Sequence, residues 1–344
     1  MLEALKASLM VYFDDGIQNI VSIYVTGSLG RQEAAFIKDS SGNLRLYNDV
    51  DLLIVVNTPL STTDILRLEN FIKDATGVQW VDILQAQVNE LRRLHTTIKN
   101  FDLINGSFLL YGRDCKGYFP TIGSRSLGSY DLSLLFFTRL YAFISSALVL
   151  AGDDHDVDSG IYVGYQLCKA VFAGVDANLL RVKSYHSSYE ERARLFNENN
   201  PSSEWLPLVD WAASYKLRPE PILGKDELRK LFNRVISFYI SEFDQSFKYF
   251  NKVSISNPCK FEKWYKRKHL ISIKRIYRII RYRKDHSFDE YCVNLSQFHY
   301  FHGLAYSDSK PRSEERSKVL LSLFHESNES ISLAEALMCA RMQL

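Results

Sequence analysis

The chain has 344 residues, long enough to bury a large core and to form two or three domains. Hydrophobic residues make up 46% of it and charged residues 24%, as in an ordinary soluble globular protein, and no internal repeat or low-complexity tract is present. The formal net charge is only +2, so the charge of the whole chain gives no reason to expect a nucleic-acid partner.

Cysteine usage indicates a reducing compartment. The five cysteines occur singly, at Cys115, Cys168, Cys259, Cys292 and Cys339. This spacing excludes a zinc ribbon and a CxxC redox motif, and it is typical of scattered thiols in a reducing environment. The N-terminal sequence has no signal-peptide pattern. We therefore expect a cytoplasmic protein, with the inner face of the membrane as the place of any peripheral contact.

The first third of the chain alternates between helical and strand patterns, which predicts a mixed sheet flanked by helices. In chain order we expect a helix over 2–20, strands over 21–25 and 49–56, a capped helix from 61 toward 77, a third strand over 78–84, a helix over 88–98 and an apolar run over 107–111. The strand over 49–56 has an apolar inner half, so it should be central in the sheet.

From about residue 130 to 250 the pattern becomes helical. The stretch 132–150 is apolar enough to suggest a membrane span, but Arg139 lies near its middle, where a charge in lipid is costly. A buried helix is the better interpretation. We therefore predict an α+β chain with a mixed-sheet domain over 1–122, an all-helical domain over 123–255 and a basic C-terminal helical region over 256–344.

Three aspartates on predicted strands form the candidate site. Asp49 and Asp51 are two residues apart, so their side chains project from the same face of one strand, and Asp82 lies on the next strand. Neighbouring carboxylates repel each other unless a cation lies between them. Carboxylate oxygens suit Mg²⁺, or Mn²⁺, together with substrate phosphates, and a third carboxylate is suited to accept a proton from an attacking hydroxyl.

A turn upstream fits the same chemistry. Gly27 follows the first strand and lets the backbone approach a phosphate closely, while Ser28 and the following amides can donate hydrogen bonds to phosphate oxygens. Arg31 lies one helical turn further on, and its planar fork matches phosphate oxygens. Taken singly, these residues are an ordinary turn, solvent-facing strand ends and a surface arginine. Their combination in this order favours a phosphoryl-transfer site.

The residues 25–33 (VTGSLGRQE) and 48–55 (NDVDLLIV) resemble the polymerase-β-like nucleotidyltransferase superfamily. Its signature is a Gly-Ser or Gly-Gly turn, then Asp-x-Asp, then a separate third aspartate. The Gly-Ser-x-x-Arg-x-Glu form is similar to the branch with protein adenylyl- and uridylyltransferases and small-molecule nucleotidyltransferases. The resemblance covers residues 21–84 well. One departure is the interval of twenty residues between Ser28 and Asp49, longer than usual, which we interpret as a hairpin insertion over 37–47.

The resemblance implies an N-terminal polymerase-β-like palm and an NTP substrate. It implies that Asp49 and Asp51 bind Mg²⁺ and that Asp82 completes the metal site. In relatives a lysine of the helical domain often contacts the nucleotide phosphates, and Lys169 is the candidate here, with an ordinary solvated helix lysine as the alternative. Three further side chains could line the acceptor side, although packing is the more usual role of such aromatic residues: Tyr185, His186 and Tyr189.

Residues 260–284 form a basic amphipathic segment. Eleven lysines and arginines occur there with a single acid, Glu262. On a helix, Tyr265 and the isoleucines at 273, 276 and 280 share one side, and arginines lie nearly opposite. Three interpretations compete: an apolar face docked on the helical domain, peripheral contact with an anionic membrane, and binding of RNA or another polyanion, which we rank below the membrane.

The sequence therefore predicts an enzyme that transfers a nucleoside monophosphate from an NTP to a hydroxyl or phosphate acceptor and releases pyrophosphate. The acceptor classes are a small molecule, a sugar or glycolipid, and a protein. The alternative is a nucleotide-binding or regulatory module without turnover, attached to a membrane or polyanion by the basic segment. The aspartates at 49, 51 and 82 are all intact, which favours the enzyme.

Overall fold

The structure is a computed structural model, and it describes residues 6, 19–38, 42, 44–47, 49–151, 156–222, 224–270, 298 and 301. The chain divides into two compact units. The first combines Met1–Asp131 with Val182–Glu220, and the second combines Leu132–Arg181 with Pro221–Leu344. The segments predicted from the sequence, 1–122, 123–255 and 256–344, are consecutive, whereas each compact unit is assembled from separate stretches of chain.

A four-stranded mixed sheet is the centre of the first unit. Its strands are β1 (Ile20–Val25), β4 (Val50–Val56), β5 (Val81–Gln87) and β6 (Phe108–Gly112), in the order β5-β4-β1-β6. β1 is antiparallel to both β4 and β6, and β4 is parallel to β5. The central position predicted for the Asp49–Val56 strand is confirmed, since β4 has neighbours on both sides.

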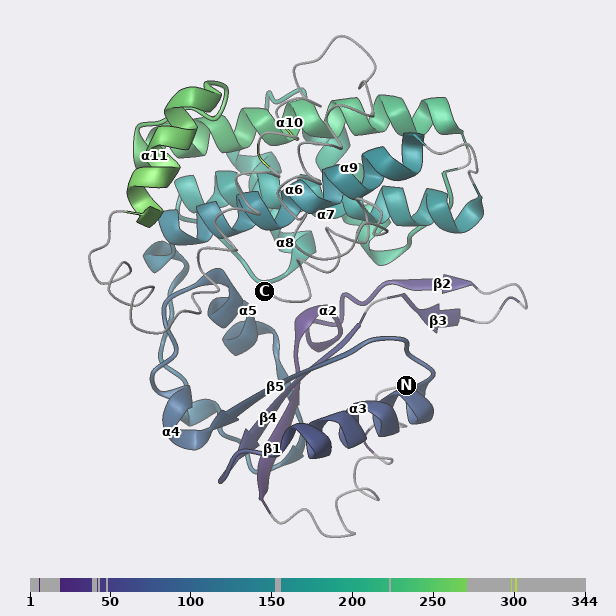
Figure 1. Cartoon of the computed structure of the whole chain (residues 1–344), viewed down its shortest axis with the longest axis vertical. Coiled ribbons are helices and arrows are strands. Elements are labelled where there is room, and N and C mark those ends of the chain that lie inside the picture. The colour runs from purple at the N-terminus through teal and green to yellow at the C-terminus, as the bar shows by residue number, and fades with distance from the viewer. Residues whose placement is uncertain are drawn as a thin grey trace, which may run out of the picture. The chain divides into compact units, whose positions relative to one another are not determined.

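Each face of this sheet carries its own apolar core. On one face, alternate residues such as Val50 and Leu52 pack with Leu68 and Ile72 of α3 (Thr62–Thr76). On the other face, Leu53, Val55 and Tyr24 pack with residues of α4 (Val88–Leu91) and α5 (Ile98–Gly106). Figure 1 shows α3 running along the sheet. The period-two alternation of β4 therefore directs its odd-numbered residues, Asp51 included, to the α4/α5 face.

The capping signals around α3 are confirmed. The Ser61 hydroxyl accepts a hydrogen bond from the Asp64 amide at 3.2 Å, and Gly77 ends the helix with φ +69°. The single helix predicted over 88–98 is wrong. α4 ends at Leu91, and α5 begins after Thr97, whose side chain accepts a hydrogen bond from the Asn100 amide and so starts a separate helix.

The extra residues before Asp49 form the predicted hairpin. Strand β2 (Phe36–Lys38) pairs antiparallel with β3 (Leu44–Leu46) in a separate two-stranded sheet. Figure 1 shows this hairpin extending away from the four-stranded sheet. The insertion therefore leaves the pairing of β1 with β4 unchanged.

The first unit also contains a segment from the middle of the chain. This segment carries α8 (Tyr189–Asn199) and α9 (Leu206–Leu217). α8 ends directly before Asn200 and Pro201, and α9 ends directly before the proline-containing stretch 218–221. A one-turn helix, α2 (Gly27–Gly30), and two 3₁₀ turns, Lys116–Tyr118 and Ser124–Ser126, complete the elements described in this unit.

The second unit is helical over its described residues. Its helices are α6 (Ser129–Ala151, of which the first three residues belong to the first unit), α7 (Val157–Arg181), α10 (Lys225–Asn251) and α11 (Pro258–Leu270). By length and composition, α6 is the one described helix that could cross a membrane, and just over half of its most apolar stretch, 56%, is buried inside the protein. Soluble core helices pass the same test, so the burial agrees with the predicted buried helix. The α+β prediction, a sheet flanked by helices and then a helical region, is confirmed.

The start of the basic segment is docked on this helical unit. Tyr265 is buried, with its ring 4.6 Å from that of Phe137, and Phe261 is fully buried. The docked interpretation therefore holds for α11. Residues 271–284 lie outside the described residues, as does nearly all of the helix predicted over 2–20, whose last residue, Ile20, begins β1.

Candidate metal and phosphate site

The antiparallel pairing of β1 with β4 brings the turn and the first two aspartates together. β1 ends where β4 begins, with Val25 opposite Leu52. The Thr26 amide continues the ladder by donating to the Asp51 carbonyl at 2.9 Å. The chain then turns at Gly27, directly beside Asp51, although the two residues are separated by the whole hairpin in sequence.

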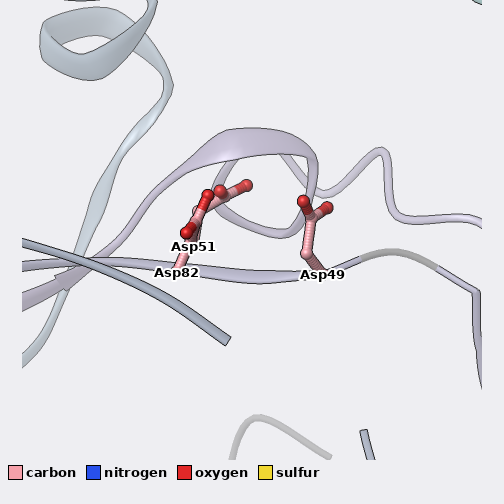
Figure 2. A group of neighbouring side chains, drawn as sticks. All are labelled: Asp49, Asp51 and Asp82. Atoms are coloured by element: carbon pink, nitrogen blue, oxygen red, sulfur yellow. The ribbon is translucent and has the colours of Figure 1, made fainter. Parts of the chain in front are cut away.

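The parallel pairing of β4 with β5 supplies the third carboxylate. Asp51 lies opposite Asp82 in the register, so both side chains leave the sheet on the same face. One carboxylate oxygen from each of Asp49, Asp51 and Asp82 lies within 4.8 Å of the others. Figure 2 shows the carboxylates on one side of the strands, toward the turn. Asp49 and Asp82 are exposed and Asp51 is half-buried, so the site is open to solvent on one side.

Only glycine fits at position 27. Its φ is +60°, a left-handed conformation that side chains disfavour. A Cβ there would also lie 1.8 Å from Oδ2 of Asp51 and 2.7 Å from its Cγ. The backbone of the turn is thus in direct contact with the central carboxylate. The close approach of this backbone to a phosphate stays a prediction; the structure shows its close approach to the Asp51 side chain.

The spacing of the carboxylates suits a divalent cation. Two oxygens bound to one Mg²⁺ at about 2.0–2.1 Å each can be at most ~4.2 Å apart. The 4.8 Å limit on the observed spacing exceeds this by an amount that a small side-chain rotation removes. Mg²⁺ usually keeps several waters and takes the remaining oxygens from substrate phosphates. The exposure of Asp49 and Asp82 leaves room for such ligands.

No protein-family model matches this chain, and no curated protein matches it. Solved chains similar to it include the crystal structure of spectinomycin adenyltransferase AAD(9) from Enterococcus faecialis with ATP and spectinomycin. That chain is 14% identical over 69% of this chain and 98% of its own length, with a TM-score of 0.40. A likeness at this level does not establish a function, which has to rest on the site itself.

Ser28 lies in the turn but is largely buried. It is 7% exposed, and its carbonyl accepts a hydrogen bond from the Glu33 amide at 2.8 Å. The Gly30 and Arg31 amides donate to the carbonyls of Thr26 and Gly27, so the turn itself uses these two of the amides predicted to face phosphate. The amides of Gly27, Ser28 and Leu29 are the remaining candidates for phosphate contact.

Arg31 contacts carboxylates of the protein. Its Nε donates to Oε2 of Glu33 at 3.2 Å, its Nη1 lies 3.9 Å from Oδ2 of Asp102, and its side chain is 8% exposed. The guanidinium also lies 5.1 Å from the centre of the Tyr189 ring. Phosphate contact by Arg31 stays a prediction, and it would require the guanidinium to exchange these partners.

Sequence reasoning missed Asp102 and Arg192. Asp102, on α5, accepts hydrogen bonds from Arg192 Nη2 at 3.0 Å and from the Tyr185 hydroxyl at 3.1 Å. Arg192 is almost fully buried and also donates to the His186 and Ser187 carbonyls. The one available signal was Asp102 itself, an acid within the otherwise uncharged stretch 100–112. Its partners are far away in sequence, so their identity could not be read from the pattern.

The remaining candidates divide between the two units. Tyr185 is buried, with its ring 5.5 Å from that of Phe101, in agreement with the packing role, and His186 accepts a hydrogen bond on Nδ1 from the Ser188 amide. Lys169 lies on α7 in the second unit, with its Nζ 4.9 Å from the centre of the Tyr165 ring. The proposed phosphate contact of Lys169 stays a prediction.

Proposed function

We propose that this protein is a nucleotidyltransferase with a polymerase-β-like palm. It transfers a nucleoside monophosphate from an NTP to a hydroxyl or phosphate acceptor on a small molecule, a sugar or glycolipid, or a protein. The observation that carries the proposal is the cluster of Asp49, Asp51 and Asp82, with oxygens within 4.8 Å of one another beside a turn at which only glycine fits. The motif over 25–33 and 48–55 supports the same reaction.

Each aspartate has a role in this proposal. Asp49 and Asp51, with Asp82, would hold Mg²⁺ or Mn²⁺. Such an ion would supply positive charge that neutralises the triphosphate during transfer. Asp82 is exposed on its strand and accepts the proton of the attacking hydroxyl. The acceptor oxygen forms a bond to the α-phosphorus, the bond from that phosphorus to the bridging oxygen breaks, and pyrophosphate leaves.

The turn binds the phosphates. The backbone at Gly27 and Ser28 reaches the site without a side chain in between, and amides in such a turn donate to phosphate oxygens. Arg31 and Lys169 are further candidates for phosphate contact, as the resemblance implies. Because β1, β4 and β5 bring the turn and the carboxylates together, one NTP can engage both.

A labelled-NTP experiment tests the reaction. Each α-labelled NTP is incubated with the protein, Mg²⁺ and a cell extract, and transferred label is analysed by mass. Transfer should be abolished by Asp49→Ala with Asp51→Ala, and it should be unchanged by Asp74→Ala, an exposed aspartate on α3. Label transfer that survives the double change would refute the metal assignment.

Binding measurements separate the enzyme from the non-catalytic module. Mn²⁺ binding is followed by the loss of the free-ion electron paramagnetic resonance signal, with and without each NTP. The proposal expects Mn²⁺ and NTP binding together with transfer. Binding of both without transfer to any acceptor in the extract would favour the regulatory module, and absence of both would remove the proposal.

A further inference from the structure

The Gly27–Ser28 turn is buttressed by the end of helix α5. A Cβ at Gly30 would lie 2.6 Å from the carbonyl oxygen of Gly106 and 2.6 Å from that of Val25. A Cβ at Gly106 would in turn lie 2.5 Å from Cγ of Arg31. Gly30 therefore packs backbone against backbone on the last residue of α5, and Gly106 leaves the space that the Arg31 side chain occupies.

The same helix holds the arginine that follows the turn. Asp102 precedes Gly106 by four residues, so both lie on one face of α5. Gly106 lies against the aliphatic part of the Arg31 side chain, and Oδ2 of Asp102 lies 3.9 Å from Nη1 of Arg31. α5 thus contacts Arg31 along most of its length.

Asp102 also fastens the segment that carries α8 to the same helix. Arg192 of α8 donates to Oδ2 of Asp102 at 3.0 Å, and the Tyr185 hydroxyl donates to the carboxylate at 3.1 Å. The Asp102 carboxylate therefore lies between two buried arginines, one from the turn and one from α8. A hydrogen bond from a charged donor to a charged acceptor is stronger than a neutral one, and burial limits its screening by water.

A second connection runs in parallel through Glu33. Its Oε2 accepts from Arg31, and its Oε1 accepts from the Ser188 hydroxyl at 2.8 Å and from the Tyr189 amide at 2.6 Å. Glu33 thereby satisfies the first amide of α8, where a negative charge is favourable. Arg31 therefore contacts both α5 and Tyr189, and Glu33 contacts Ser188 and Tyr189, so both residues are held by the segment that carries α8.

We propose that Asp102 is a positioning residue that sets the Gly27–Ser28 turn against Asp51 through Arg31. It touches neither the carboxylate cluster nor the proposed phosphate-binding backbone. Without the Asp102 charge, Arg31 loses one of its two carboxylate partners and the turn opens locally more often. The consequence for substrate rests on the proposed function: a mobile turn binds the NTP phosphates less tightly, whereas the three aspartates still bind a cation.

Hydrogen exchange of the full chain tests the positioning without any reliance on activity. Five amides around the turn are hydrogen-bonded in the structure, those of Thr26, Gly30, Arg31, Gln32 and Glu33. In Asp102→Asn, which keeps the shape of the side chain, a peptide covering residues 24–33 should exchange about tenfold faster. The peptide of α3 should be unchanged. The matched control is Glu198→Gln, which removes an exposed ion-pair partner of Arg194 on α8.

A second variant keeps the test decisive if Asp102→Asn does not fold. Tyr185→Phe leaves the buried ring and removes only its hydrogen bonds to Asp102, so a smaller increase in exchange at 24–33 is expected. Asp102→Glu, which restores the charge, should recover part of the protection. Equal exchange at 24–33 in wild type, Asp102→Asn and Tyr185→Phe would overturn the proposal, as would an equal increase in the α3 peptide, which would show general destabilisation.

Binding constants then test the consequence. Asp102→Asn should raise the Kd for NTP in the presence of Mn²⁺ by at least about fivefold and change the Kd for Mn²⁺ alone less than twofold. An unchanged Kd for NTP would overturn the positioning role toward substrate. If the wild-type protein binds no NTP, the proposed function fails, while the exchange result still decides whether Asp102 sets the turn.

Discussion

Gly27 and Asp51 are in contact, backbone against carboxylate, where β1 ends and the antiparallel strand β4 begins. A methyl group on Gly27 would lie 1.8 Å from Oδ2 of Asp51. A side chain at position 27 would therefore have to displace the Asp51 carboxylate, which links the turn proposed to bind phosphate to the central carboxylate of the proposed metal site. This relationship gives the candidate site its most direct mutational test.

Gly27→Ala should lower nucleotidyl transfer by at least about 100-fold, because displacing a reacting group by 1 Å can cost that much. The matched control is Gly77→Ala. Gly77 has a similar φ of +69°, but a Cβ there would meet nothing within 4 Å. Gly77→Ala should therefore cost only ~1 kcal/mol of stability from its left-handed backbone and leave transfer unchanged. Equal activity of the two variants would contradict the contact.

Asp82→Asn should lower kcat by about 10²–10⁴-fold while the KM for NTP changes little, because loss of a proton acceptor acts mainly on the chemical step. Asp49→Asn should raise the apparent requirement for Mg²⁺, since it removes a ligand oxygen. Steady-state kinetics over a Mg²⁺ series distinguishes the two. A raised Mg²⁺ requirement in both variants with no difference in kcat would assign Asp82 to metal binding alone.

Glu33→Gln should lower the free energy of unfolding by about 1–3 kcal/mol, the cost of leaving buried charged partners poorly paired. Glu33 is 8% exposed and accepts from Arg31, from Ser188 and from the Tyr189 amide. An amide can satisfy only part of this set, because its NH₂ group donates. Urea unfolding measures the change, with Asp226→Asn, an exposed ion-pair residue of α10, as the control expected to stay within about 0.5 kcal/mol.

The contribution of the Tyr24 phenol to the free energy of unfolding should be lost between pH 10 and about pH 12. Burial raises the pKa of Tyr24 to about 12 from its ordinary value of 10.0, and the Asp114 carboxylate beside its hydroxyl adds to the rise. Below pH 10 the phenol is protonated in both the folded and unfolded chains, so its full contribution is present. Above pH 10 the unfolded chain ionises first, and the contribution is lost as pH rises toward 12.

Tyr24→Phe is the comparison for that loss. It should be less stable at neutral pH by ~1 kcal/mol, because it lacks the bonds to Asp114 and from the Cys115 amide. Its stability should fall less steeply above pH 10 than that of the wild type. Urea unfolding at a series of pH values measures both, and parallel curves would show that Tyr24 is not responsible.

Tyr265→Ala should cost ~3–5 kcal/mol, as for other large buried aromatic residues, because its ring packs on Phe137 and Phe261. Lys263→Ser, on the exposed side of α11, should have little effect on the free energy of unfolding.

Binding of the segment 260–284 to anionic vesicles is a separate prediction. If the segment 260–284 contacts a membrane, binding should be salt-sensitive and lost when Ile273, Ile276 and Ile280 are changed to Ser. Equal binding by that variant would exclude the contact.

Local patterns predicted much of the sheet unit. The apolar run after Asp51 predicted a central strand, and Ser61 and Gly77 predicted the ends of α3, each through conformational preferences of a few neighbouring residues. The long interval before Asp49 predicted the hairpin. The break between α4 and α5 was missed because the apolar periodicity continues across it. Thr97, whose side chain caps α5, was the local signal for that break.

The candidate site was predictable in composition and not in arrangement. The period of a strand predicted that Asp49 and Asp51 share one face. The position of Asp82 opposite Asp51 depends on the pairing of β4 with β5, which the sequence pattern did not specify. The antiparallel pairing of β1 and β4, which brings Gly27 to Asp51, depends on contacts across the whole sheet. Besides the nearby Glu33, the partners of Arg31 are Asp102 and Tyr189, which are far away in sequence, so no local pattern could show that they engage its guanidinium.

The path of the chain between the two compact units determines which fragments of the gene encode a complete sheet unit. The chain leaves the sheet unit after Asp131, returns at Val182 and leaves again after Glu220. A gene fragment that ends at Asp131 would encode Asp102 without Arg192. It would also encode Glu33 without the start of α8, whose first amide Glu33 accepts from. The sheet unit is therefore not encoded by one continuous stretch of sequence, and recombination cannot transfer it as a single segment. Any shorter version would need a designed linker joining residue 131 to residue 182.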